Sequence, residues 1–240
     1  MNEHHGTGIA EEIKIGWEVH PQSIQPGEEA VIKIAVKDRH GIPATAFSVV
    51  HEKQMHLLAI SQDLSFFQHI HPKYKGDGEF EVNTRFPNPG IYKLYADFMP
   101  EDGTQKLATY EVTIQGTVHD KEIYPDREWK KGINGLEFEL KFGSLAANEH
   151  LEMAFTIRDE DTQEPIVKLE PYLGSAGHVV IVSGDLEKFL HVHPTTEETA
   201  GPMVTYMTSF PKPGIYKIWG QFKYKNELYT VPFVVDVPDK

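Results

Sequence analysis

The chain has 240 residues, a length that suggests one large or two ordinary domains. Its 36 acidic and 23 basic residues give a formal net charge of −13, which argues against a nucleic-acid partner, because phosphate binding needs a basic face. The lack of cysteine excludes disulfide frameworks, thiolate zinc sites, iron–sulfur clusters and the blue-copper centre, which requires a Cys ligand.

The N-terminal residues 1–11 are polar and are predicted to form a disordered tail. They contain no apolar leader region, and no apolar run in the chain is long enough to cross a bilayer. We therefore expect no transmembrane segment in this chain. A cytoplasmic protein and the mature part of an exported protein both fit this N-terminus.

From Ile13 onward the first half contains short alternating or apolar runs that are separated by turn residues and show no helical period. About seven short strands at such spacing are typical of an antiparallel β-sandwich. The predicted strands are Ile13–Val19, Ala30–Val36, His56–Ile60, Phe66–His71, Phe80–Phe86, Ile91–Phe98 and Leu107–Ile114.

The second half repeats this plan. The turn FPNPGIYK at Phe86–Lys93 returns as FPKPGIYK at Phe210–Lys217, and we assign both copies a structural role in setting an inter-strand turn. The predicted strands here are Leu136–Phe142, Leu151–Ile157, Asp159–Pro165, His178–Val182, Phe189–His193, Val204–Phe210, Ile215–Phe222 and Leu228–Val237.

The predicted fold class is therefore all-β, with two tandem Ig-like antiparallel β-sandwich domains related by internal duplication. The first domain is expected over residues 12–116 and the second over residues 133–240. Residues 117–132 have no counterpart in the repeat and are expected to form a linker.

A histidine pattern is part of the duplication. The segment MHLLAISQDLSFFQHIHP, Met55–Pro72, corresponds to GHVVIVSGDLEKFLHVHP, Gly177–Pro194. Each segment has one histidine at the head of an apolar run and a His-x-His-Pro sequence at the end of the next run. The histidines are His56, His69 and His71 in the first half, and His178, His191 and His193 in the second half.

Residues two apart in a strand point to the same face, so His69 and His71 lie side by side. A Gln62-Asp63 turn would place His56 opposite His69, and an Asp63-Leu64 turn would place it opposite His71. Either register puts the three imidazoles on one face, where they could share one metal ion. We expect such a site at the end of each sandwich remote from the turn, floored by aliphatic side chains, with Pro72 and Pro194 stopping the strands.

Imidazole suits copper, zinc and nickel, and the predicted cofactor is Cu(II), with Zn(II) as the second candidate. One alternative is a zinc-dependent hydrolase or hydratase that uses the same three-His sites. Its weakness is that the recurring carboxylates, Asp63 and Asp185, are expected to cap the turns rather than to act as bases. Another alternative is a structural Ig-like tandem without metal. The fourth ligand is left open, since no candidate for it is duplicated: His51, Met55, Met203 and Met207.

The run from Gly177-His178 through Ser183-Gly184-Asp185-Leu186 to His191-Val192-His193-Pro194, followed by FPKPGIYK, resembles bacterial YtkA-like domains. These are Ig-like extracytoplasmic modules associated with copper and heavy-metal handling. A looser similarity is to the copper-resistance CopC-like sandwiches. The resemblance implies an exported or lipid-anchored protein whose leader is absent from this chain. Its expected partners are metal ions and another metal-handling protein.

Overall fold

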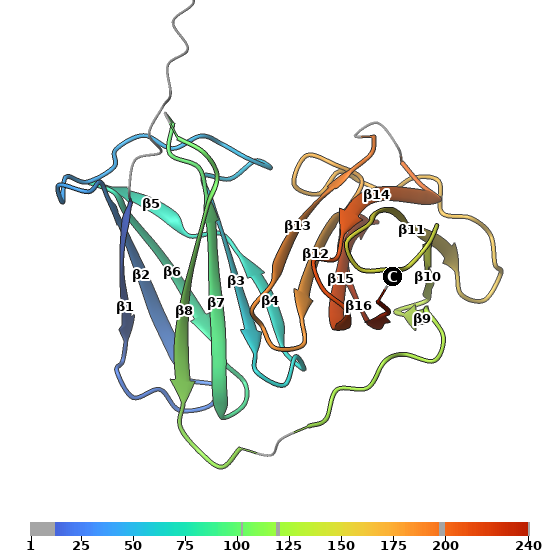
Figure 1. The fold of residues 1–240 in the computed structure, drawn as a ribbon, viewed down its shortest axis with the longest axis horizontal. Helices are drawn as coiled ribbons and strands as arrows, with labels where there is room; N and C mark the ends of the chain where they lie inside the picture. Colours follow the sequence, from blue (N-terminus) through green and yellow to red (C-terminus); the bar gives the residue numbers. More distant parts are fainter. Residues whose placement is uncertain (1–12, 102, 119–120, 197–199, 240) are drawn as a thin grey trace, which may run out of the picture. The chain divides into compact units, whose positions relative to one another are not determined.

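The computed structural model describes residues 13–101, 103–118, 121–196 and 200–239, so the predicted tail over residues 1–11 lies outside the described residues. The described part is built from β-strands and turns and contains no helix, which confirms the all-β prediction. The chain divides into two compact units, Met1–Asp120 and Lys121–Lys240, whose strands are labelled in Figure 1. No helix that could span a membrane occurs in the described ranges.

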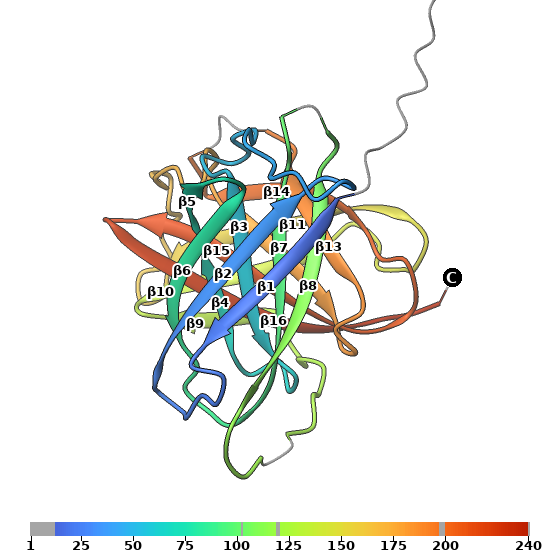
Figure 2. The same cartoon turned by 90° about the vertical axis from the view of Figure 1, so that its left-hand side faces the viewer.

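The first unit is a sandwich of two four-stranded antiparallel sheets, with strand orders β1-β2-β6-β5 and β4-β3-β7-β8. Figure 2 looks onto the first of these sheets, in which β1, β2 and β6 run side by side. The strands are β1 (Lys14–His20), β2 (Glu29–Lys37), β3 (Met55–Ser61), β4 (Phe67–Ile70), β5 (Lys73–Gly76), β6 (Glu79–Arg85), β7 (Gly90–Phe98) and β8 (Lys106–Ile114).

The core of the first unit is formed by alternate residues, as the period of two requires. Ile32 and Ile34 of β2 face Leu57 and Ala59 of β3 within one buried cluster. Their strand neighbours, His56 among them, therefore point to the outer face of the second sheet.

The second unit uses the same strand plan in one continuous eight-stranded antiparallel sheet, with order β16-β15-β12-β13-β14-β11-β10-β9. Its core again contains alternate residues, such as Val179 and Ile181 of β12. The strands are β9 (Lys130–Ile133), β10 (Leu136–Phe142), β11 (His150–Asp159), β12 (His178–Ser183), β13 (Phe189–Pro194), β14 (Met203–Ser209), β15 (Gly214–Tyr224) and β16 (Glu227–Val237).

The two prolines that we expected to stop the histidine strands mark the place where the chain passes from one layer to the other. In the first unit β4 ends at Ile70 and β5 starts directly after Pro72, in the opposite sheet. In the second unit β13 includes Pro194, which is paired with Tyr206 of β14. Pro194 is the last residue of β13, as expected, and the strand extends one residue beyond the predicted bound His193; β13 pairs with β12 and then with β14. Proline lacks only the N–H, so its carbonyl can still join a ladder.

Two predictions need correction. Asp159–Pro165 is not a strand, because the Asp159 carboxylate accepts hydrogen bonds from the backbone N–H and the hydroxyl of Thr162 and so folds the chain into a turn. The predicted linker 117–132 also overlaps the second unit. Lys130–Ile133 forms β9 against β10, and the Asp126 backbone N–H donates to the Val234 carbonyl at 2.9 Å.

Candidate metal centre

The β3–β4 hairpin fixes the positions of the first histidine triad. Leu58 pairs with His69, and the same register extended by one pair sets His71 opposite His56. Of the two turn registers considered, this is the one with Asp63 and Leu64 at its tip, and Leu64 has a positive φ of 55° there. The triad therefore lies at the hairpin end remote from the turn, as expected, on the outer face of the sheet.

The three imidazoles of this triad converge. One ring nitrogen from each of His56, His69 and His71 lies within 4.8 Å of the other two. His56 Nδ1 lies 3.0 Å from His69 Nε2. The ring centroid of His71 lies 5.0 Å from that of His56 and 4.9 Å from that of His69. The predicted set of three ligands from one half of the chain is thus brought together in space.

A backbone carbonyl orients the ring of His56. His56 Nε2 lies 2.9 Å from the Val50 carbonyl oxygen, which can only accept, so Nε2 carries the proton and Nδ1 presents its lone pair to the triad. The Val50 carbonyl is held by a tight turn in which Val50 and Lys53 exchange backbone hydrogen bonds. A second hydrogen bond that fixes the tautomer in this way is the usual outer support of a metal-binding histidine.

The ring of His71 supplies the second chemical feature of the site. Its Nε2 atom is buried and has no hydrogen-bond partner in the described part of the chain. Burial, with smaller contributions from the charges of His56 and Lys53, lowers the pKa of His71 to about 4. His71 is therefore neutral at pH 7, and neutral imidazole is the form that binds metal.

These observations fit a metal ion. Imidazole nitrogens at about 2.0–2.1 Å from an ion are separated by about 2.9 Å at adjacent corners of a square and about 3.3 Å in a tetrahedron. The 3.0 Å between His56 Nδ1 and His69 Nε2 lies between these two values, and all three nitrogens lie within 4.8 Å of one another, so small rotations of the rings would complete the geometry. An ion would also supply the missing partner of His71 Nε2.

The second triad can be followed only in its backbone. Val180 pairs with His191, and the same register extended sets His178 opposite His193, as in the first unit. His178 is buried at 7% exposure. The side chains of His191 and His193 lie outside the described part of the structure, so the second predicted site stays a prediction.

The predicted turn caps are confirmed. Asp63 Oδ1 accepts hydrogen bonds from the hydroxyl of Ser61 and from the backbone N–H and hydroxyl of Ser65. Asp185 accepts from the Ser183 hydroxyl and from the backbone N–H of Glu187 in the same way. Both carboxylates therefore serve their turns at the far end of the hairpins.

The repeated FPxPGIYK motif has the structural role that we expected. The Tyr92 hydroxyl donates to the Asn88 carbonyl at 2.9 Å, and the Tyr216 hydroxyl donates to the Lys212 carbonyl at 2.9 Å. Each tyrosine thus closes the turn that precedes its own strand, in the manner of the tyrosine corner of Ig-like sandwiches.

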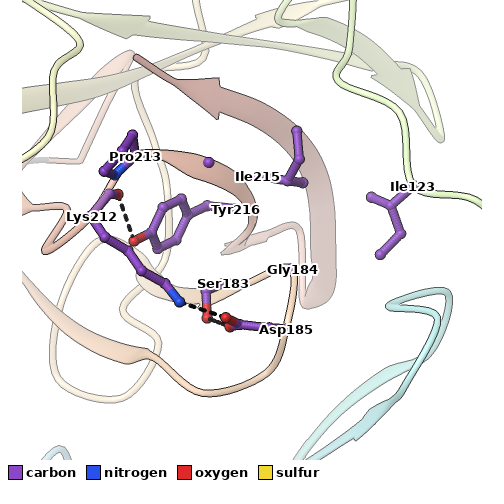
Figure 3. Close-up of a pocket in the computed structure, with 9 residues that line it drawn as sticks. Ile123, Ser183, Gly184, Asp185, Lys212, Pro213, Ile215 and Tyr216 are labelled. Atoms are coloured by element: carbon purple, nitrogen blue, oxygen red, sulfur yellow. Dashed lines mark hydrogen bonds and ion pairs between the residues drawn. The ribbon is translucent and has the colours of Figure 1, made fainter. Parts of the chain in front are cut away.

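A pocket of about 450 Å³ lies beside this turn in the second unit, between Ile123, Gly184 and Ile215. Figure 3 shows that its polar groups face one another: Lys212 Nζ lies 2.5 Å from Asp185 Oδ2, and Asp185 also accepts from Ser183. Because these contacts hold the turn together, we assign the pocket no ligand.

The structure places two residues beside the first triad that were not predicted from the sequence, Asp97 and Gln105. Asp97 of β7 is the direct cross-strand partner of His56 and is only 4% exposed. Its carboxylate oxygens lie 2.7 and 2.8 Å from the side-chain nitrogen of Gln105. The candidate fourth ligand His51 lies close to the triad, with its ring centroid 6.2 Å from that of His56, although it is outside the converging set.

The solved structures that the chain matches include two bacterial adhesins. The match to the Escherichia coli adhesin FdeC has 14% sequence identity and a TM-score of 0.28, and it covers 95% of this chain and 64% of the adhesin chain. Yersinia pseudotuberculosis adhesin InvE gives 8% identity and a TM-score of 0.33, with coverage of 97% and 62%. Escherichia coli alpha-2-macroglobulin gives 14% identity and a TM-score of 0.36, with coverage of 97% and 22%. The chain thus spans less than two thirds of the length of these proteins.

No curated protein is similar enough in sequence to count as a relative. One family model matches the chain twice, over residues 10–116 and 131–239, and so covers both repeats. Its description is "Domain of unknown function (DUF8832)". The YtkA-like resemblance is not shown by these comparisons. The chain belongs to the DUF8832 family and carries two copies of its domain.

Proposed function

We propose that this protein binds metal ions through its duplicated histidine triads, one ion per repeat, for metal buffering, transfer or resistance. The observation that carries the proposal is the convergence of one nitrogen from each of His56, His69 and His71 within 4.8 Å. The partnerless Nε2 of His71 and the carbonyl that orients His56 support it. The second site, His178 with His191 and His193, follows from the identical spacing and backbone register.

Cu(II) is the proposed ion and Zn(II) its rival. Three imidazoles suit both ions, and Cu(II) binding needs no catalytic helper. A zinc hydrolase or hydratase would need a general base beside the metal-bound water. The recurring carboxylates Asp63 and Asp185 are engaged in their turns, and Asp97 is not duplicated. The proposal places the protein outside the cytoplasm, exported or lipid-anchored, where it would exchange metal with another metal-handling protein.

Equilibrium dialysis against Cu(II) tests the proposal by stoichiometry. The intact protein should bind two equivalents, and His69→Ala/His71→Ala and His191→Ala/His193→Ala should each bind one. His20→Ala/His150→Ala is the matched control, because both residues are exposed and lie outside the triads. Unchanged stoichiometry in the two triad variants would refute the proposal. A visible d–d band identifies copper binding, whereas ester hydrolysis or CO₂ hydration by the zinc form would favour the enzyme.

A further inference from the structure

Asp97 differs from its counterpart in the other repeat. His56 of β3 pairs with Asp97 of β7, and the corresponding His178 of β12 pairs with Gln221 of β15. Both partners are buried, at 4% and 3% exposure. The Gln221 side-chain nitrogen lies 3.3 Å from the Thr230 hydroxyl, whereas Asp97 is held by Gln105. The two repeats thus place a carboxylate and a neutral amide at the same position beside the first histidine.

The direct pairing places Asp97 beside the triad. Opposed residues of an antiparallel pair point to the same face with Cβ atoms about 4.5–5.5 Å apart. Asp97 therefore lies on the histidine face of the sheet, and Asp97, His56 and Lys53 line one small hollow together with Val50 and Gln105. A carboxylate this close to a group of imidazoles makes the site more attractive to a cation, since a buried position screens its charge weakly.

A second charge difference accompanies the first. Lys53 ends the tight turn that orients His56, and the corresponding turn of the second unit, between Tyr172 and Ser175, ends in a neutral residue. The first site therefore has an ammonium group that repels a metal ion and a carboxylate that offsets this repulsion. At the two corresponding positions the second repeat has Gln221 and Ser175, which are neutral.

We propose that Asp97, held in place by Gln105, is the residue that compensates the charge of a divalent cation bound to His56, His69 and His71. This inference rests on the proposed metal-binding function. It makes the two repeats unequal: affinity at the first site depends on a carboxylate, and affinity at the second site does not. Asp97 acts as a charge-compensating residue beside His56, and the imidazoles bind the ion.

Metal titration in a His191→Ala/His193→Ala background, which keeps the first of the two proposed sites intact, tests the inference. Asp97→Asn should weaken Cu(II) binding about 10- to 100-fold, the range typical of groups that support metal ligands. Asp97→Gln, which introduces the residue type of the second repeat, should have the same effect. Lys53→Gln removes the opposing charge and should tighten binding. The circular dichroism and melting temperature of each metal-free variant serve as controls for folding.

The outcomes separate the two ideas. If the background protein binds no metal, the proposed function fails. If it binds Cu(II) and the folded Asp97→Asn variant binds equally well, the inference fails and the proposed function stands. Should the Asp97 variants not fold, Lys53→Gln decides alone: tighter binding supports the compensating charge, and unchanged or weaker binding contradicts it.

Discussion

Replacing His71 with leucine should stabilise the metal-free protein while it destroys the metal site. The Nε2 atom of His71 is buried without a partner, and an unsatisfied buried polar group costs about 1–3 kcal/mol. Because the side chain as a whole is only half-buried, the lower end of that range applies. Leucine has no such atom, so we expect the free energy of unfolding to rise by about 1 kcal/mol in a chelator. His69→Leu is the matched control and should lower it, since it removes the contact of His69 with His56.

The stabilisation of the metal-free protein by His71→Leu should depend on pH. The pKa of His71 is about 4 in the folded protein and 6.5 in the unfolded chain, so the unfolded state binds the extra proton as the pH falls. The free energy of unfolding of the metal-free wild type should therefore have its full value above pH 6.5 and decline between pH 6.5 and pH 4. The full shift corresponds to about 3.4 kcal/mol, which solvent screening of a half-exposed ring reduces to about 1–2 kcal/mol. His71→Leu should lack this part of the decline.

Urea denaturation, with hydrogen exchange of the β3 and β4 peptides to isolate the first unit, measures both effects. Cu(II) at about 100 times its dissociation constant should stabilise the first unit of the wild type by about 2.7 kcal/mol and leave the first unit of His71→Leu unchanged. The order of stability of the two proteins should thus reverse when metal is added. If His71→Leu were less stable than the wild type in the chelator at both pH 7 and pH 5, the reasoning would be refuted.

Three predictions concern the scaffold. Tyr216→Phe removes the hydroxyl that bonds to the Lys212 carbonyl and should cost about 1 kcal/mol of unfolding free energy in urea. Gly78→Ala should cost more, since Gly78 has a φ of +75° and an added Cβ would lie 2.4 Å from the Val36 carbonyl oxygen; an unchanged melting temperature would contradict this. Burial raises the pKa of Asp185, but hydrogen bonds from Lys212 and Ser183 outweigh this effect and lower the pKa below its ordinary value. Stability from Asp185 should therefore be present above the ordinary aspartate pKa and decline as the pH falls below it, and Asp185→Asn should abolish this decline.

Much of the fold could be predicted from sequence, because turn residues and alternation are local signals. The short alternating runs, the FPxPGIYK motif and the internal duplication together predicted two antiparallel sandwiches. The misses have local causes as well. The polar segment Asp159–Pro165 has no apolar alternation, and Asp159 bonds to the backbone of Thr162 ahead of it. The short strands β5 and β9 have too few residues to show a period.

The candidate site was predictable as far as it lies within one hairpin. The spacing of His56, His69 and His71 places them on one face whichever turn register applies. Asp97 could not be predicted, because it comes from β7, and only the β3–β7 register shows that it faces His56. The orientation of His56 by the Val50 carbonyl also depends on a turn whose two central residues, His51 and Glu52, have positive φ values of 48° and 64°, which few non-glycine residues adopt.

X-ray absorption spectroscopy of the copper-loaded His191→Ala/His193→Ala protein tests the central claim most directly. Of the two proposed sites, the first triad is then the intact one, and its three histidines are His56, His69 and His71. We predict a first shell that contains three imidazole nitrogens at about 2.0 Å, with the outer-shell scattering that imidazole rings produce. A shell of oxygen atoms without imidazole scattering, or a protein that retains no copper after dialysis, would contradict the account.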